Sequence, residues 1–163
     1  MTSTVRQIEA AIIAVLKSAL GDAAMVVGYR ESVAQGEVKS SDGDGRPEVL
    51  VAVSPATSDN YASPVVSYDV AASVRLEWAD DPTIAAFDET AAVVEFTLQR
   101  FNVRENLAAM SAALTTDNFR CDGFRLNGGA DSIEAGDGRN VISTTFNFAV
   151  KGVFKDTTNE SEA

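Results

Sequence analysis

The sequence predicts a single α+β domain, with two or three helices packed on one face of a mixed or antiparallel sheet of about five strands. Hydrophobic residues make up 45% of the 163 positions, which is ordinary for a globular chain. Apolar residues recur every three or four positions in some segments and every second position in others, which are the periods of helices and strands. No linker divides these segments into two groups. We therefore expect one domain over residues 1–155, followed by a disordered acidic tail at 156–163.

The first elements expected along the chain are one helix and two strands. In Thr4 to Leu20 the apolar residues form one stripe, polar residues that can cap a helix precede it, and Gly21 is placed to end it. Ala24 to Tyr29 and Glu48 to Val53 are short apolar runs typical of strands. The polar segments interpreted as loops are Gln35 to Pro47 and Ser54 to Pro64.

The clearest pattern in the sequence is the alternation of apolar and polar residues from Val66 to Trp78. A period of two over this length predicts a long strand with one buried face and one wetter face. Ordinary strands have about five or six residues, so this strand is exceptional. It either extends beyond its own core, where it can pair with another subunit, or bends within a single sheet. The sequence leaves both possibilities open.

Two further helices and two closing strands are expected in the second half of the chain. A helix is predicted from Pro82 to Phe101, because acidic residues precede it and an apolar seam runs along it. A short third helix is predicted from Leu107 to Leu114. Strands are predicted at Phe119 to Leu126 and at Val141 to Phe154. The glycine- and acid-rich segment between them, Asn127 to Asn140, is interpreted as a long hairpin loop.

The charge and the missing residue types argue against several functional classes. With 24 acidic and 13 basic residues the net charge is −11, which argues against nucleic-acid binding through the overall field. The chain has no histidine, which removes the catalytic triads and metal sites that depend on it. Cys121 is the sole cysteine and is expected to be a buried, inert thiol. No apolar run is long enough to span a bilayer. We expect a protein that is not an enzyme and that has no cofactor, no metal ion and no membrane partner.

Two weaker motifs each have a plainer interpretation. The tetrapeptide Gly-Asp-Gly-Arg occurs at residues 43–46 and again at 136–139, but the unlike flanks favour coincidental turns over a duplication. Asp42 starts a run that resembles a calcium loop, yet Arg46 and Pro47 stand where a ligand and a glycine belong. Solvated acidic loops are therefore the favoured interpretation of both segments.

The order of these elements resembles that of the small tail-terminator, or tail-completion, proteins of long-tailed bacteriophages. The resemblance covers residues 4–155 and is carried by the N-terminal helix, the long strand ending at Trp78, the helix ending at Phe101 and the aromatic closing strand Val141 to Phe154. It implies an α+β protein of the virion tail or neck, made in the host bacterial cytoplasm, that forms a hexameric ring on the finished tail tube. Such a ring stops tube polymerisation and presents a joining surface to the head. The implied partners are further copies of the chain in head-to-tail contact, the tail tube protein, and the head connector or neck proteins.

The predicted loops Ser54 to Pro64 and Asn127 to Asn140 are the expected contact elements, because long loops, beyond about twelve residues, in a compact domain tend to be functional. The residues expected to contact another subunit or a partner are Ser54, Asp59, Tyr61, Asn127, Asp131, Glu134, Asp137 and Arg139. A tail-tube, baseplate or head–tail adaptor protein would share the composition and the long strands, so these alternatives stay open. An acidic inhibitor that mimics DNA belongs to a different class and would need a denser acidic face than one with interspersed bases.

Overall fold

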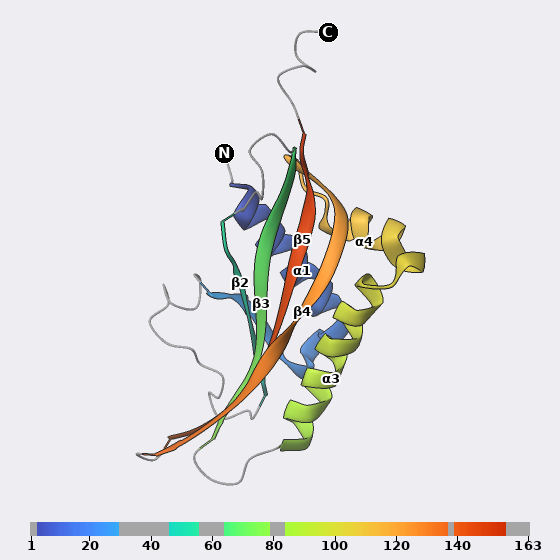
Figure 1. Ribbon diagram of the computed structural model, residues 1–163. Coiled ribbons are helices and arrows are strands. Elements are labelled where there is room, and N and C mark those ends of the chain that lie inside the picture. The colour runs from blue at the N-terminus through green and yellow to red at the C-terminus, as the bar shows by residue number, and fades with distance from the viewer. Residues whose placement is uncertain (1–2, 30–45, 56–63, 79–83, 137–138, 156–163) are drawn as a thin grey trace, which may run out of the picture.

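A five-stranded mixed sheet, covered on one face by helices, forms the core of the fold (Figure 1). The computed structural model describes residues 3–29, 46–55, 64–78, 84–136 and 139–155. Within these ranges the α-helices are α1 (Thr4–Leu20), α3 (Ile84–Phe101) and α4 (Leu107–Leu114), and the strands are β1 (Met25–Gly28), β2 (Glu48–Val53), β3 (Val65–Trp78), β4 (Phe119–Gly136) and β5 (Arg139–Phe154). The predicted fold class, α+β with helices on one face of the sheet, is confirmed.

The strands lie in the order β1-β2-β3-β5-β4. β1 pairs with β2 in parallel, and the other neighbouring strands are antiparallel. β3 pairs with β5 along its whole length, from Val65 opposite Val153 to Trp78 opposite Asn140. The long strand expected from the alternation of the sequence therefore finds its partner within the same chain. β1 and β4 lie at the two edges of the described sheet.

Helix α1 begins and ends where its sequence predicts. The Ser3 side-chain oxygen accepts a hydrogen bond from the backbone N–H of Arg6 at 3.3 Å, which caps the first turn. Gly21 follows the last turn with a φ of 57°, a conformation that favours glycine, and its N–H donates to the Lys17 carbonyl. The apolar stripe is buried against the sheet and the other helices, and it consists of Ile8, Ile12, Leu16 and Leu20.

The alternation along β3 determines which face of the sheet carries the core. The buried residues of this strand are Tyr68, Val70, Ala72, Val74 and Leu76, and those between them are half-buried or exposed. Tyr68 meets Phe119 of β4 edge to face, with ring centroids 5.3 Å apart. Burial of a large apolar side chain contributes about 1.5–3 kcal/mol, so the helices stabilise one face of the sheet.

One sequence-based expectation is wrong. The segment Asn127 to Asn140, interpreted as a hairpin loop, is mostly strand, because β4 continues to Gly136 and β5 begins at Arg139. β5 is held by β3 from Asn140 to Val153, so its other edge offers backbone donors and acceptors to a segment that returns along it. The polar and glycine-rich composition of the segment is therefore outweighed by backbone pairing that the sequence of the segment does not display.

The remaining bounds are close to the predicted ones. β2 and α4 have their predicted limits, while β1 is one residue shorter at each end, running from Met25 to Gly28. Parts of the prediction lie outside the described residues, and they stay predictions. These parts are most of the loops Gln35 to Pro47 and Ser54 to Pro64, the start of the helix before Ile84, and the tail at 156–163.

Candidate functional site

Edge strand β4 ends in a segment that leaves the layer covered by helices. We define the arm as residues 129–136 of β4 together with residues 139–145 of β5. The β4 side chains from Ala130 to Glu134 are all exposed. In Figure 1 the arm extends toward the lower left, away from α1 and α4. The outer backbone edge of β4 has no neighbouring strand within the described sheet, and such an edge is a surface on which another chain can dock.

An apolar row across the arm is buried at one end and exposed at the other. Leu76 on β3, Ile142 on β5 and Ile133 on β4 lie opposite one another on the face that carries the core. Leu76 is 1% exposed, Ile142 is half-buried, and Ile133 is 72% exposed. An isoleucine in water forgoes about 1.5–3 kcal/mol relative to full burial. Ile133 is therefore the described side chain of the arm that gains most free energy from being covered by a partner.

A β-bulge at the base of the arm separates it from the rest of the sheet. The pairing register with β5 shifts between Leu126 and Gly129. Gly128 has a φ of 86°, in the left-handed region that glycine enters without steric cost. A Cβ atom on Gly129 would collide with the backbone carbonyl of Thr145. The two glycines thus allow β4 to change direction and still pair closely with β5.

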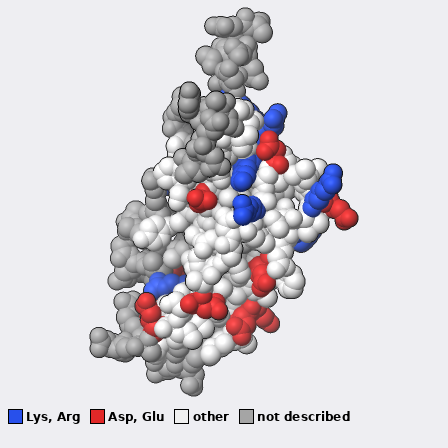
Figure 2. All heavy atoms as spheres, viewed as in Figure 1, with Lys and Arg blue, Asp and Glu red and all other residues white. Residues whose placement is uncertain are grey.

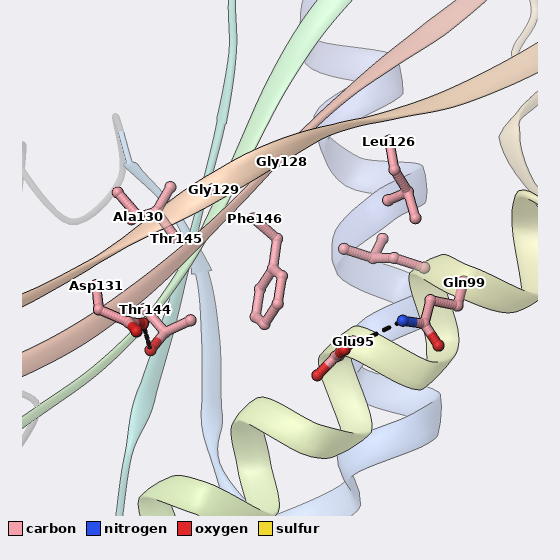
Figure 3. A pocket seen from close by; sticks show the side chains of 11 residues that line it. Glu95, Gln99, Leu126, Gly128, Gly129, Ala130, Asp131, Thr144, Thr145 and Phe146 are labelled. Atoms are coloured by element: carbon pink, nitrogen blue, oxygen red, sulfur yellow. Dashed lines mark hydrogen bonds between the residues drawn. The ribbon is translucent and has the colours of Figure 1, made fainter.

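A groove of about 350 Å³ lies between the arm and α3 (Figure 3). Glu95 on α3 and Asp131 on the arm both line it. Glu95 accepts a hydrogen bond from Gln99 Nε2 at 3.1 Å, and Asp131 accepts one from Thr144 Oγ1 at 2.7 Å. The apolar lining of the groove is formed by Leu98, Leu126 and Phe146. Apolar residues beside exposed acidic groups suit a docked side chain better than a reacting substrate.

The hairpin of β4 and β5 carries bases at one end and acids at the other. We define the basic stripe as Arg120, Arg125 and Lys151, which lie on the face of the sheet opposite the helices. Asp131 and Glu134 lie at the other end, on the arm. Figure 2 shows the same separation, with Lys and Arg concentrated toward the upper part of the view and Asp and Glu prevailing in the lower part. The molecule therefore has an electrically polarised surface despite its overall negative charge.

Cys121 lies in the core, as the sequence predicts. Its sulfur is 3.4 Å from Met110 Sδ, and the side chain is fully buried. Burial raises the pKa of the thiol to about 11, because the interior disfavours the thiolate; a hydrogen bond with the Gly123 backbone partly opposes this shift. A thiol with this pKa is a poor nucleophile at neutral pH.

Glu48 is a buried carboxyl group on β2. It is 2% exposed, and one of its side-chain oxygens has no hydrogen-bond partner. Burial raises the pKa of Glu48, the nearby Arg75 guanidinium lowers it, and Glu77 raises it. Arg75 itself pairs with Glu77 at 3.5 Å. Glu48 therefore belongs to a small charged network on β2 and β3, in which Arg75 lies opposite Ser143 of the arm and Glu77 lies opposite Val141.

The predicted contact residues lie on two different parts of the sheet. Asn127, Asp131 and Glu134 are exposed on β4, so the structure brings them together on one strand. Ser54 follows β2, where its N–H donates to the Asp69 carbonyl at 2.9 Å, and it is not part of this group. The predicted residues whose side chains lie outside the described part of the chain are Asp59, Tyr61, Asp137 and Arg139.

Sequence reasoning missed the apolar and basic residues of these surfaces. Ile133 is the single large apolar side chain in a glycine- and acid-rich segment, and that isolation was a usable signal. The basic stripe had no such signal, because Arg120 and Lys151 are far apart in sequence and meet through β-pairing. Glu95 joins the groove because α3 packs beside the arm.

The described ranges contain neither a metal-binding cluster nor a membrane-spanning helix. No group of three or more His, Cys, Asp or Glu side chains there is arranged to hold a metal ion. No helix in the same ranges is both long and apolar enough to cross a bilayer.

The fold and these surfaces define an α+β protein with a one-sided helical layer, a projecting β-arm and a polarised surface. Neither a scan of protein-family models nor a comparison with curated proteins gives a match to this chain.

Proposed function

We propose that this chain is a structural virion protein that assembles with copies of itself into a ring, caps the tail tube of a long-tailed bacteriophage, and forms the head–tail joining surface. The observation that carries self-assembly is the arm, a projecting edge strand on which Ile133 is 72% exposed. Isolated exposed apolar residues are common, but one on an unpaired strand edge is a site for association.

A catalytic role has little chemical support. The chain contains no histidine, and the one cysteine is a buried thiol with a raised pKa. The carboxylates beside the groove, Glu95 and Asp131, are exposed and accept hydrogen bonds from neighbouring side chains. A surface of this kind favours contact between macromolecules over bond-breaking chemistry.

The assignment to a phage tail rests on the resemblance in size and element order to tail-terminator proteins. The net charge of −11 fits this role, because like-charge repulsion keeps DNA from adhering to a conduit through which it must pass. The same charge with a different assembly geometry would suit a tail-tube, baseplate or adaptor protein.

The test is the mass and shape of the purified chain, with and without tail tubes, by light scattering and negative-stain microscopy. A closed ring on tube ends supports the proposal, and six copies of 17.2 kDa would have a mass of about 103 kDa. Open tubes would assign the chain to the tube or baseplate instead. A chain that stays monomeric and does not bind tail tubes at any concentration would refute the virion role and favour a DNA-mimicking inhibitor.

The Ile133→Ser variant tests whether the exposed side chain of the arm drives self-assembly. Its side chain is exposed, so the fold should be unchanged by circular dichroism while assembly weakens. Capping of tubes by a variant that remains monomeric would show that tube binding does not require the ring.

A further inference from the structure

We propose that the arm of one copy docks on the basic stripe of a neighbouring copy, in a head-to-tail contact. This inference rests on the proposed self-assembly and names the two surfaces that make it. The partner that covers the arm is therefore a second copy of this chain.

The arm carries an exposed apolar side chain and exposed acids on both of its faces. Ile133 and Asp131 lie on the face that carries the core, Glu134 lies on the opposite face, and all three are exposed. Asp131 keeps one oxygen on Thr144, and no ion pair within the described residues includes Glu134. Such an arm is best covered by a partner that offers apolar surface and positive charge side by side.

The stripe presents that complementary chemistry. Val65, Val153 and Arg120 lie opposite one another across β3, β5 and β4, on the face opposite the helices. Val65 is 44% exposed and Val153 is half-buried, so the row offers an apolar surface beside a cation. Lys151 and Arg125 continue the positive charge along the same hairpin.

The balance of charge near the stripe is positive. Asp122 on β4 and Asp69 on β3 are the exposed acids closest to it in the pairing register. Within the described part of the chain, no ion pair includes Arg120, Arg125 or Lys151. These cations are therefore available to an acidic surface, in a chain where acids outnumber bases 24 to 13.

The arm of a molecule cannot reach its own stripe. Arg125 is opposite Ala149 and Glu134 is opposite Val141, so they are separated by about 25 Å along the same rigid hairpin. Contact between the two surfaces therefore joins different copies. A contact between unlike surfaces is heterologous, and it closes into a ring or continues as an open polymer according to the rotation between copies.

The experiment is a charge exchange measured by sedimentation velocity over a range of concentrations. One variant carries Asp131→Lys and Glu134→Lys, and the other carries Arg120→Glu and Arg125→Glu. Each should weaken association by about tenfold or more, because attraction between exposed charges becomes repulsion. The control, Asp22→Lys with Glu105→Lys, makes the same change in net charge as the arm variant at exposed sites outside both surfaces, and it should associate at least as well as the wild type.

An equimolar mixture of the two variants is the decisive measurement. Each reversed surface then meets its complement on the other variant, so assembly should return although neither variant assembles alone. Association of the wild type should also weaken as salt rises from about 0.05 M to about 0.5 M. Circular dichroism checks the folds, and the single exchanges Glu134→Lys and Arg125→Glu, mixed in the same way, replace any double variant that does not fold.

The outcomes separate this inference from the proposed function. If the wild type forms a ring and both variants form it equally well, the arm–stripe contact is overturned and the proposed ring stands. Charge-dependent association that stops at two copies supports the contact and refutes the ring. A wild type that is monomeric at all concentrations overturns both.

Discussion

Replacing Gly152 with alanine should destabilise the hairpin from which the arm projects. Gly152 is buried on β5 opposite Cys121. A Cβ atom there would collide with the backbone carbonyl of Arg120 and would lie 2.6 Å from Cζ of Phe119. Contacts this short require one of the two neighbours to move.

Neither neighbour can move without a large loss of folding free energy. The Arg120 carbonyl is held by the pairing of β4 with β5, where Arg120 lies opposite Val153. The Phe119 ring is fully buried and has its centroid 5.3 Å from that of Tyr68 and 6.4 Å from that of Phe154. Overpacking typically costs about 1–3 kcal/mol, and two immobile obstacles place Gly152→Ala at about 3 kcal/mol. For a chain of this size that corresponds to a melting temperature lower by about 6–12 °C.

The assay is urea denaturation followed by circular dichroism, with Gly123→Ala as the matched control on the same hairpin. A Cβ on Gly123 would lie 3.3 Å from Cβ of Lys151, and the half-buried Lys151 side chain can yield. The control should therefore change stability by less than about 1 kcal/mol. Equal midpoints for Gly152→Ala and the wild type would refute the close approach of β4 and β5 at this position.

Three further predictions concern a thiol, a carboxyl group and the arm. Burial and a pKa of about 11 should keep Cys121 unreactive toward a thiol reagent at pH about 8, with labelling only in denaturant; rapid labelling of the folded chain would contradict its burial. The raised pKa of Glu48 means that the folded state holds the proton more tightly than the unfolded state, whose value is near 4.5. Stability from this group is thus complete below that value and is lost as pH rises through the folded pKa. Glu48→Gln should therefore reduce the loss of stability that urea titration shows as pH rises above about 4.5, and an unaltered loss would exclude Glu48 as its source. Gly129→Ala should raise amide hydrogen exchange in the arm and weaken assembly, because its Cβ meets the Thr145 carbonyl at the base of the arm; unchanged exchange would show that the arm does not need glycine there.

Local sequence determined the helices and the central strand. The stripe and the two ends of α1, from Thr4 to Leu20, follow from side-chain periodicity, a serine cap and a glycine stop. The alternation along β3 predicted its buried residues from Tyr68 to Leu76. These features are readable because each depends on neighbours within about one or two turns of the chain or on the two-residue period of a strand.

The candidate site was predicted only in part. Asp131 and Glu134 were identified from their position in a long acidic segment, and the structure places both on the arm. Their supposed loop is a strand, and the residues that complete the surfaces, Ile133 and the basic stripe, were not foreseen. Asp59, Tyr61 and Asp137 stay predictions, because they lie outside the described residues.

Tertiary structure alone decided the course of β4 and the gathering of charge along it. β4 extends to Gly136 because β5 supplies backbone partners on both sides of the bulge, and β5 does so because β3 holds it on its other side. The same pairing brings Lys151 beside Arg120 and Arg125, although they lie on different strands. Backbone hydrogen bonding is common to all residue types, so the side chains of a segment do not reveal which strand it will join.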